Sequence, residues 1–257
     1  MSHPTDIGED PYAIARRLRH HDPYQLAFMA QEVFGDRIYM RHGIQVGPGS
    51  VVLDVGANVG VTAAFFSQLC RATTVHAFEP VDPLFELLEA NVSAFPGCYA
   101  HHHGLGARNG HAAITYYPRA GAMSGLYADP VQDAEAARRY LMNRGYDSDR
   151  IDEMLVGVHE PQAMVCELRR LSDVLREQSI ERVDLLKIDV ERAEVDVLAG
   201  IDDTDWPRIR QIIVEVHDED GRCAQVAAQL EARGFVVAVD QDPEWRGTPL
   251  YMLYARR

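Results

Sequence analysis

A strand that leads into a glycine turn, within residues 51–66, constrains the fold of this chain more than any other feature. An apolar run ends in an acid, Asp54, and Gly56 and Gly60 follow as a helical pattern begins near Val59. A buried strand that passes through a tight turn into a helix N-terminus presents backbone N–H groups to a ligand. The segment therefore predicts an α/β sheet with a ligand site at this turn.

Two details of the turn narrow the choice of ligand. Its spacing is D-x-G-x-x-x-G rather than G-x-G-x-x-G, and the carboxylate of Asp54 would repel a dinucleotide pyrophosphate but suits a cationic amino group. Glu79 lies 25 residues later, after a second apolar run, where α/β nucleotide sites keep an acid for the ribose hydroxyls. Together these features predict a site for S-adenosylmethionine.

Composition and charge exclude several classes of protein. The chain has 257 residues, enough for one α/β domain, and a net charge of −14 at pH 7. An acidic chain does not suit a nucleic-acid backbone or an anionic membrane, since both require a positive surface. The sequence has no signal-peptide pattern, no apolar run near the ~20 residues of a membrane span, and four scattered cysteines without a C-x-x-C pair. We expect a cytoplasmic protein with reduced thiols that binds neither nucleic acid nor membrane.

Strand-like and helix-like patterns alternate from residue 51 onward, which favours a mostly parallel sheet with helices on both faces. The last segment, 250–255, follows a strand without an intervening helix, so we expect it to pair antiparallel with 234–240. The other predicted strands are 51–55, 74–78, 98–103, 183–189 and 210–216, and the predicted helices lie near 60–70, 83–94, 192–199 and 221–233.

Two regions lie outside this alternation. The first region is residues 1–45, which we expect to form a helical lead-in before the ligand-binding domain of residues 46–257. Within that domain, residues 119–165 contain no clear strand but carry charged, helical patterns. An insertion of this length in an α/β domain is usually functional, so we expect a lid or a wall of a substrate pocket.

Polar residues interrupt two of the predicted strands. Lys187 and Asp189 lie on one face of their strand, and Glu215 and His217 lie on one face of theirs, because side chains alternate along a strand. A purely structural explanation is a buried ion pair of Lys187 with Glu215 or Asp189. Asp189 and His217 come last on their strands, nearest the crevice where such sheets bind ligands, so we assign them a functional role. Lys187 and Glu215 remain catalytic candidates beside them.

These residue types suit methyl transfer from a sulfonium to a hydroxyl. The reaction requires an in-line approach of the acceptor and removal of the hydroxyl proton. His217 is the preferred base, since an imidazole titrates near neutral pH and a carboxylate can fix its tautomer. The alternative is a divalent cation held by Asp189, Glu215 and His217 or Asp218, which would lower the pKa of the hydroxyl directly.

Other candidate residues carry weaker signals. His101, His102 and His103 are consecutive, so they cannot all face one metal from a strand, and we expect them at an edge or in a loop. Leu105 follows them as a candidate wall for the adenine. Ser124 opens the insertion, where it contacts the cofactor or the acceptor, or only stabilises a turn.

Several motifs match a known family. The matching segments include VFGDRIYMRHGIQVGPGSVVLDVGANVG (33–60), VHAFEP (75–80), YYPRAGAMSGLY (116–127), DLLKIDVERAEVDVLAG (184–200) and DWPRIRQIIVEVHDEDG (205–221). On these motifs the chain resembles the FkbM-type S-adenosylmethionine-dependent O-methyltransferases. It departs from the family at Arg192, where lysine or glycine often follows the VE pair.

The resemblance implies the seven-stranded, mostly parallel class I methyltransferase fold (Rossmann-like, with helices on both faces) and methylation of a hydroxyl. By the motif match, Asp54, Gly56, Asn58 and Gly60 would hold the methionine portion of the cofactor and form its turn, and Glu79 would bind the ribose. The MSGLY motif and the insertion resemble the branch that acts on polyketides, macrolides and related natural products, as free molecules or on carrier proteins. The product of the cofactor would be S-adenosylhomocysteine.

Three other functions compete with this one. The acceptor could be a sugar hydroxyl on a glycan or glycolipid, or the domain could bind the cofactor without catalysis. A nicotinamide-dependent oxidoreductase is disfavoured, because the sequence lacks G-x-G-x-x-G after its first strand.

Overall fold

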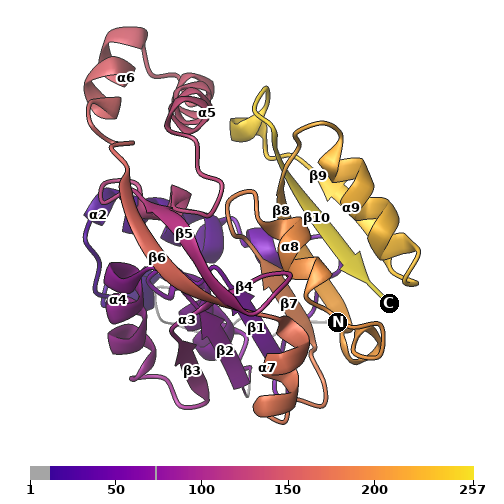
Figure 1. Ribbon diagram of the computed structural model, residues 1–257. Coiled ribbons are helices and arrows are strands. Elements are labelled where there is room, and N and C mark those ends of the chain that lie inside the picture. Colours follow the sequence, from indigo (N-terminus) through magenta and orange to yellow (C-terminus); the bar gives the residue numbers. More distant parts are fainter. Residues whose placement is uncertain (1–11, 73) are drawn as a thin grey trace, which may run out of the picture.

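A seven-stranded sheet forms the centre of the protein, in a computed structural model that describes residues 12–72 and 74–257 (Figure 1). The order across the sheet is β3 (Cys98–His101), β2 (Thr74–Phe78), β1 (Val51–Val55), β7 (Leu185–Ile188), β8 (Gln211–His217), β10 (Leu250–Arg256) and β9 (Val236–Asp240). All pairs are parallel except those of β10, which is antiparallel to β8 and β9. The predicted sheet is confirmed, including the antiparallel return of the last segment.

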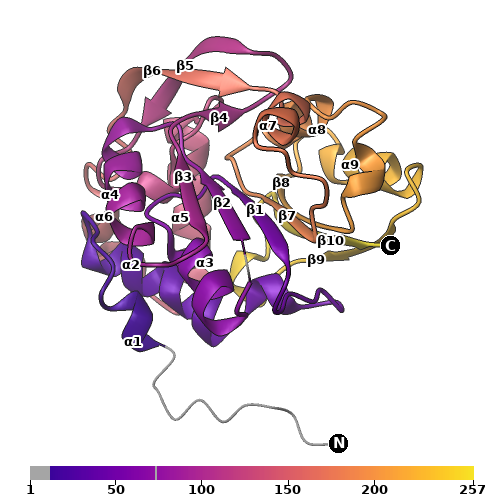
Figure 2. The same ribbon diagram turned by 90° about the horizontal axis from the view of Figure 1, so that it is seen from below.

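Helices cover both faces of the sheet, as the alternating pattern predicts (Figure 2). One face carries α3 (Val61–Ala64), the π-helix η3 (Phe65–Leu69) and α4 (Asp82–Val92), and the other carries α7 (Leu171–Glu177), α8 (Glu194–Ala199) and α9 (Arg222–Glu231). Within β1, Val52 packs into the first of these layers and Leu53 and Val55 into the second. Because both faces are apolar, polar groups accumulate at the carboxyl ends of the strands.

The described part of the lead-in contains four helical segments joined by turns, and residues 1–11 of the predicted lead-in lie outside the described residues. Asp22 caps the second helix by accepting hydrogen bonds from the N–H groups of Tyr24 and Gln25. The Tyr254 hydroxyl of β10 donates to the Ile38 carbonyl at 2.9 Å, which fixes the lead-in against the central sheet. Its elements are α1 (Tyr12–Ala15), α2 (Pro23–Ala30), the π-helix η1 (Gln31–Gly35) and the 3-10 helix η2 (Ile38–Met40).

A second, three-stranded sheet follows the order β4 (Gly104–Leu105), β6 (Gln162–Arg169) and β5 (Gly110–Tyr116). The prediction that 119–165 lacks a strand is wrong at its C-terminal end, where β6 begins at Gln162. The apolar side chains of β6 lie on both faces: Val165 is 68% exposed whereas Cys166 is 4% exposed. The alternation that marks a strand is therefore lost in the sequence.

The chain between β5 and β6, residues 117–161, forms a helical cap over the carboxyl ends of the central strands (Figure 1). The side chain of Asn143 donates to the carbonyl groups of two residues in the β9–β10 connection, at 2.8 and 2.9 Å. The ring of Tyr140 lies 4.5 Å from that of Trp245 and 5.4 Å from that of Phe28 in α2. The cap is thus held between the lead-in and the β9–β10 connection. The helices of the cap are η4 (Gly121–Met123), α5 (Pro130–Asn143) and α6 (Ser148–Leu155). The helix that the cap contacts in the β9–β10 connection is η6 (Pro243–Trp245).

Two further expectations can be compared with the structure. The four cysteines are free thiols, as their scattered positions predict. Within residues 12–72 and 74–257, none of the helices has both the length and the apolar character needed to cross a bilayer.

Candidate active site

The glycine turn after β1 requires its glycines. Gly56, Asn58 and Gly60 have φ angles of 77°, 50° and 89°, in the left-handed region that glycine adopts without strain. A Cβ atom on Gly56 would lie 1.7 Å from the carbonyl oxygen of Asp189, in the segment that follows β7. The turn and this segment therefore touch through their backbones, at the predicted carboxyl edge of the sheet.

Glu79 lies beside the turn, as predicted. One carboxylate oxygen accepts a hydrogen bond from the N–H of Asn58 at 2.9 Å, and the other accepts from the N–H of Val81 at 2.9 Å. Burial raises the pKa of Glu79 to about 7, although both N–H groups lower it. The carboxylate lines the same cavity as Leu105, which leaves it available to hydroxyl donors of a ligand.

Asp54 and Lys187 form a buried ion pair behind the turn. They are register partners in β1 and β7, and the Lys187 ammonium lies 3.0 Å from Oδ1 of Asp54 and 3.4 Å from Oδ2 of Asp189. The same ammonium donates to the Gly56 carbonyl at 2.8 Å. Burial lowers the pKa of Lys187, but the Asp54 and Asp189 carboxylates raise it to a net value above the ordinary one. Lys187 thus holds the turn in place, and its contact with Asp189 matches the purely structural explanation of this residue.

The carboxylate of Asp54 has a different partner from the one expected. Asp54 has no exposed surface, and its charge is compensated by Lys187 within the protein. This geometry therefore does not favour the expected direct contact between Asp54 and a cationic amino group of a ligand. Local sequence could not reveal the pair, because it depends on β1 and β7 being neighbours in the sheet.

Tyr39 reaches the site from the lead-in and was not among the predicted site residues. Its hydroxyl donates to Oδ2 of Asp189 at 3.2 Å, and the side chain is 5% exposed. Its only sequence signal is its position in the family-like segment 33–60. We call Asp54, Lys187, Asp189 and Tyr39 the turn cluster, since together they support the glycine turn.

His217, at the end of β8, lies between two carboxylates. Its Nε2 is 3.2 Å from Oε2 of Glu191, and its Nδ1 is 3.2 Å from Oε1 of Glu194. Burial lowers the pKa of His217, but hydrogen bonds and charges of Glu191 and Glu194 raise it well above the ordinary histidine value. Both ring nitrogens therefore donate hydrogen bonds to these carboxylates. His217 has no free nitrogen that could accept the proton of a hydroxyl group. We call Glu191, Glu194 and His217 the cavity cluster.

The set of residues that could bind a divalent cation also differs from the predicted one. Among the described residues, the one trio of potential metal ligands whose donor atoms lie within 4.8 Å of each other is Glu191, Glu215 and His217. Glu191 thus takes the place that the sequence assigned to Asp189. Burial and the charges of Asp189 and Glu191 raise the pKa of Glu215 well above the ordinary glutamate value.

The segment that follows β7 has an unusual backbone. Glu191 and Arg192 have φ angles of 51° and 73°, although neither is glycine. Arg192 is buried, and its guanidinium lies 2.7 Å from Oδ1 of Asp133 in α5 and 2.8 Å from Oε1 of Glu219 after β8. A Cβ atom on Gly125 would lie 2.7 Å from that of Glu191. The cap thus contacts the cavity cluster directly.

Ser124 and the three histidines can now be placed. The Ser124 hydroxyl accepts from the N–H of Tyr117 at 3.0 Å, so it stabilises a turn, and the residue also lines the cavity. His101 lies on the edge strand β3 and pairs with His76 at 3.0 Å. In the loop that follows, His102 contacts Asp82 at 2.8 Å and His103 contacts the Gly104 carbonyl at 3.2 Å. The expected positions of these histidines, at an edge strand or in a loop, are thus confirmed.

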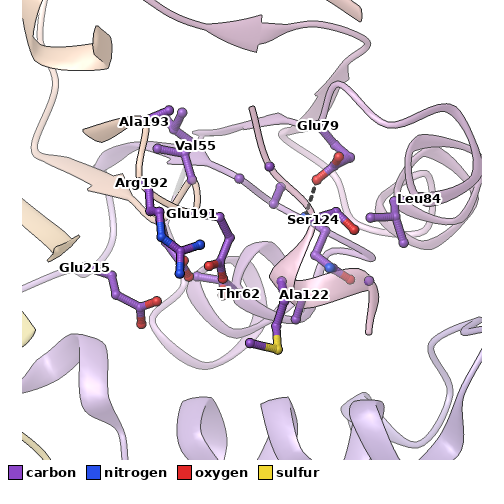
Figure 3. A pocket seen from close by; sticks show the side chains of 18 of the residues that line it. Val55, Thr62, Glu79, Leu84, Ala122, Ser124, Glu191, Arg192, Ala193 and Glu215 are labelled. Atoms are coloured by element: carbon purple, nitrogen blue, oxygen red, sulfur yellow. Dashed lines mark hydrogen bonds between the residues drawn. The ribbon is translucent and has the colours of Figure 1, made fainter. Parts of the chain in front are cut away.

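One cavity joins these parts (Figure 3). Glu79 and Ser124 lie on one side of it, and Glu191, Arg192 and Glu215 lie on the other. Beyond the acids, the lead-in, the cap, η6 and the first residue of β10 close the cavity with mostly apolar side chains. These include Phe28, Met29, Val33, Ala136, Trp245 and Leu250, beside the acid Glu32, whose pKa is raised to about 8 by burial.

The strand order, with its cavity where the glycine turn follows β1, defines a class I methyltransferase. Residues 54–237 match the model of the methyltransferase FkbM domain. The chain belongs to the FkbM methyltransferase family and is an S-adenosylmethionine-dependent methyltransferase.

Similar proteins include a methyltransferase from Streptomyces tacrolimicus and a synthetase from Pseudomonas aeruginosa. The chain is 40% identical to the 31-O-demethyl-FK506 methyltransferase FkbM of Streptomyces tacrolimicus, over 93% of both chains. It is also 40% identical to a part of the AMB antimetabolite synthetase AmbE of Pseudomonas aeruginosa, over 90% of this chain but 12% of that one. The crystal structure of the methyltransferase FkbM from Methylobacillus flagellatus superposes with a TM-score of 0.51 at 11% identity, over 94% of this chain and 57% of the other, which supports the fold alone.

Proposed function

We propose that this enzyme transfers the methyl group of S-adenosylmethionine to a hydroxyl of a polyketide, a macrolide or a related natural product. The observation that carries the proposal is the single cavity that connects the glycine turn and Glu79 to a mostly apolar chamber beneath the cap. The name of the Streptomyces relative, which specifies an O-demethylated macrolide as its acceptor, supports this class of acceptor.

The residues at the turn fit S-adenosylmethionine. Gly56 and Gly60 allow the left-handed turn and its close packing against the Asp189 carbonyl and Leu88. Gly56 and Asn58 line the cavity, so a ligand bound there lies against this turn. The carboxylate of Glu79, held by two N–H groups, is suited to the ribose hydroxyls. Leu105 and Ser124 would complete the wall. Bound there, S-adenosylmethionine supplies an activated methyl group and a thioether leaving group.

The charges around the cavity suit a sulfonium cation. The charged groups that line the cavity include the acids Glu79, Asp133, Asp189, Glu191 and Glu215 and the cations Lys187, Arg192 and His217. In a partly dry site, this excess of carboxylates attracts a positive ligand more strongly than it would in water. We assign the turn cluster to holding the donor and the cavity cluster to orienting the acceptor and removing its proton.

Calorimetry with the purified protein tests the donor half. We expect binding of S-adenosylhomocysteine and none of NAD, because the turn lacks a pyrophosphate loop. Absence of binding to S-adenosylhomocysteine would contradict the proposal. NAD binding would instead favour an oxidoreductase.

A methyl-transfer assay tests the acceptor half. Labelled S-adenosylmethionine is supplied with hydroxylated macrolides such as 31-O-demethyl-FK506, with hydroxyacyl chains on a carrier protein, and with oligosaccharides. We expect label on a macrolide or polyketide hydroxyl. Label only on the oligosaccharides would support the sugar alternative, and label on carrier-bound chains would match the similarity to the synthetase.

A further inference from the structure

Glu191 is held in a costly backbone conformation at the centre of the cavity wall. Two consecutive residues, Glu191 and Arg192, adopt left-handed φ angles of 51° and 73°. Such conformations persist only where the surrounding structure enforces them, and they cluster at functional sites. The direction of the Glu191 side chain is therefore fixed by more than its own preferences.

Three contacts enforce this conformation. The N–H of Arg192 donates to Oε1 of Glu194 at 3.0 Å, and the guanidinium of Arg192 pairs with the buried Asp133 of the cap. Gly125 supplies the third contact: only a residue without a side chain leaves room for the Cβ and the carbonyl of Glu191, which would lie 2.7 and 2.9 Å from a Cβ at this position. The cap and α8 thus clamp Glu191 from two sides.

The two oxygens of the Glu191 carboxylate have different surroundings. Oε2 lies 3.2 Å from Nε2 of His217, whose other nitrogen is held by the fully buried Glu194. For Oε1, no hydrogen bond or ion pair is found among residues 12–72 and 74–257, and Glu191 lines the cavity. A row of Glu194, His217 and Glu191 therefore ends in one oxygen that is free to meet a ligand.

Other groups in the cavity are less suited to accept a proton. Both nitrogens of His217 are occupied by carboxylates. Asp189 belongs to the turn cluster, because its Oδ2 contacts both Tyr39 and Lys187, although no partner of its Oδ1 is found among the described residues. Burial raises the pKa of both Glu215 and Glu191, but the hydrogen bond and charge of the His217 imidazolium act in the opposite direction on Glu191. No cation bonded to Glu215 is found among residues 12–72 and 74–257, whereas Glu191 contacts His217 directly.

We propose that Glu191 is the catalytic residue that accepts the proton of the acceptor hydroxyl, with His217 and Glu194 as positioning residues. The inference rests on the proposed function. The acceptor O–H bond breaks as its oxygen bonds to the methyl carbon, the S–CH₃ bond breaks with its electron pair staying on sulfur, and the proton moves to Oε1. A sulfonium and a carboxylate thus become a thioether and a carboxylic acid, and this loss of charge is favoured in a poorly hydrated cavity.

The variant Glu191→Gln tests this role. Glutamine keeps the size of the side chain and can still contact His217, but it does not accept the proton. With the acceptor of highest turnover, we expect kcat to fall by ~10²–10⁴-fold, while KM for the acceptor and Kd for S-adenosylhomocysteine stay near those of the wild type. Glu231→Gln, an exposed change on α9, is the matched control and should leave kcat unchanged.

A kcat within about threefold of the wild type in Glu191→Gln would overturn the assignment. A parallel loss of cofactor affinity would also overturn it, because Glu191 would then act through the structure of the site. A wild-type protein that binds no S-adenosylhomocysteine would instead contradict the proposed function itself.

A spectroscopic measurement tests the same role without an acceptor. A base must be ionised at the working pH, so the side-chain carboxyl carbon of Glu191 should show the ¹³C shift of a carboxylate at pH 8 with S-adenosylhomocysteine bound. The signal is assigned by its loss in Glu191→Gln. The shift of a neutral carboxylic acid at pH 8 would overturn the proposal.

Discussion

The turn cluster and the cavity cluster are both buried groups of acids around one cation, yet they differ in what they leave unpaired. In the turn cluster, Lys187 contacts Asp54, Asp189 and a backbone carbonyl, and Asp54 has no exposed surface. In the cavity cluster, the imidazolium of His217 is equally enclosed, but Glu191 keeps one oxygen toward the cavity. The first arrangement suits stability and the second suits chemistry.

The difference teaches that a buried charge in a strand is weak evidence for catalysis until its partners are known. Lys187 and His217 interrupt their strands in the same way in the sequence. Only the neighbouring strands and the segment after β7 decide that one cation supports a backbone turn and the other supports a carboxylate at the cavity.

The largest expected effect on stability comes from breaking the turn cluster. Lys187→Met leaves Asp54 buried without a partner, so we expect a loss of ~3–5 kcal/mol in the free energy of unfolding, measured by urea denaturation. The double variant Asp54→Asn/Lys187→Met removes both charges and should recover most of the loss. A single-variant loss below about 1 kcal/mol would mean that the pair is as weak as a surface ion pair.

A smaller effect, confined to activity, is expected at the contact between the cap and the cavity cluster. In Gly125→Ala the new methyl group displaces Glu191, so kcat should fall by about 10²-fold, while binding of S-adenosylhomocysteine is retained. Gly47→Ala is the control, because a Cβ there meets no atom within 4 Å. Equal effects of both substitutions on kcat would show that Gly125 has no special contact.

A several-fold effect is expected from the pH dependence of cofactor binding. Burial raises the pKa of Glu79 to about 7, so its carboxylate becomes protonated as the pH falls through that value. Ionised carboxylates accept hydrogen bonds more strongly, and Kd for S-adenosylhomocysteine should rise by ~3–10-fold from pH 8 to pH 6. Titration calorimetry measures the change, and Glu79→Gln should flatten it.

The ionisation of Glu79 affects folding stability in the opposite direction. The folded state holds the Glu79 proton more tightly than the unfolded state, so this contribution is present below the ordinary pKa of 4.5 and is lost as the pH rises through about 7. A Kd that stays constant between pH 8 and pH 6 in the wild type would argue against a contact between Glu79 and the cofactor.

The smallest expected effect is that of removing metal ions. Because His217 is already enclosed by Glu191 and Glu194, we expect turnover to survive a strong chelator without gain from added magnesium. Loss of turnover with the chelator and its rescue by magnesium would instead support a cation at Glu191, Glu215 and His217.

The glycine turn and the position of Glu79 beside it can be predicted from the sequence because these features are local. The acid, the glycines and the helix start lie within a few residues, and Glu79 follows the next strand. Glycines at this spacing predict left-handed backbone angles directly, so the prediction needs no knowledge of distant residues.

The acceptor half of the site depends on contacts between residues that are far apart in the sequence. Arg192 meets Asp133 across 59 residues of chain, and Tyr39 meets Asp189 across 150. Neither contact leaves a periodic pattern, and the left-handed angles of Glu191 have no glycine to mark them. The second sheet is also hidden, because β6 exposes apolar side chains.

A crystal structure of the complex with S-adenosylhomocysteine tests the central claim most directly. We expect the ribose on the carboxylate of Glu79, the methionine portion along the glycine turn, and the sulfur facing the free oxygen of Glu191 across the cavity. A ligand bound away from the turn, or a Glu191 carboxylate turned out of the cavity in the complex, would contradict the account.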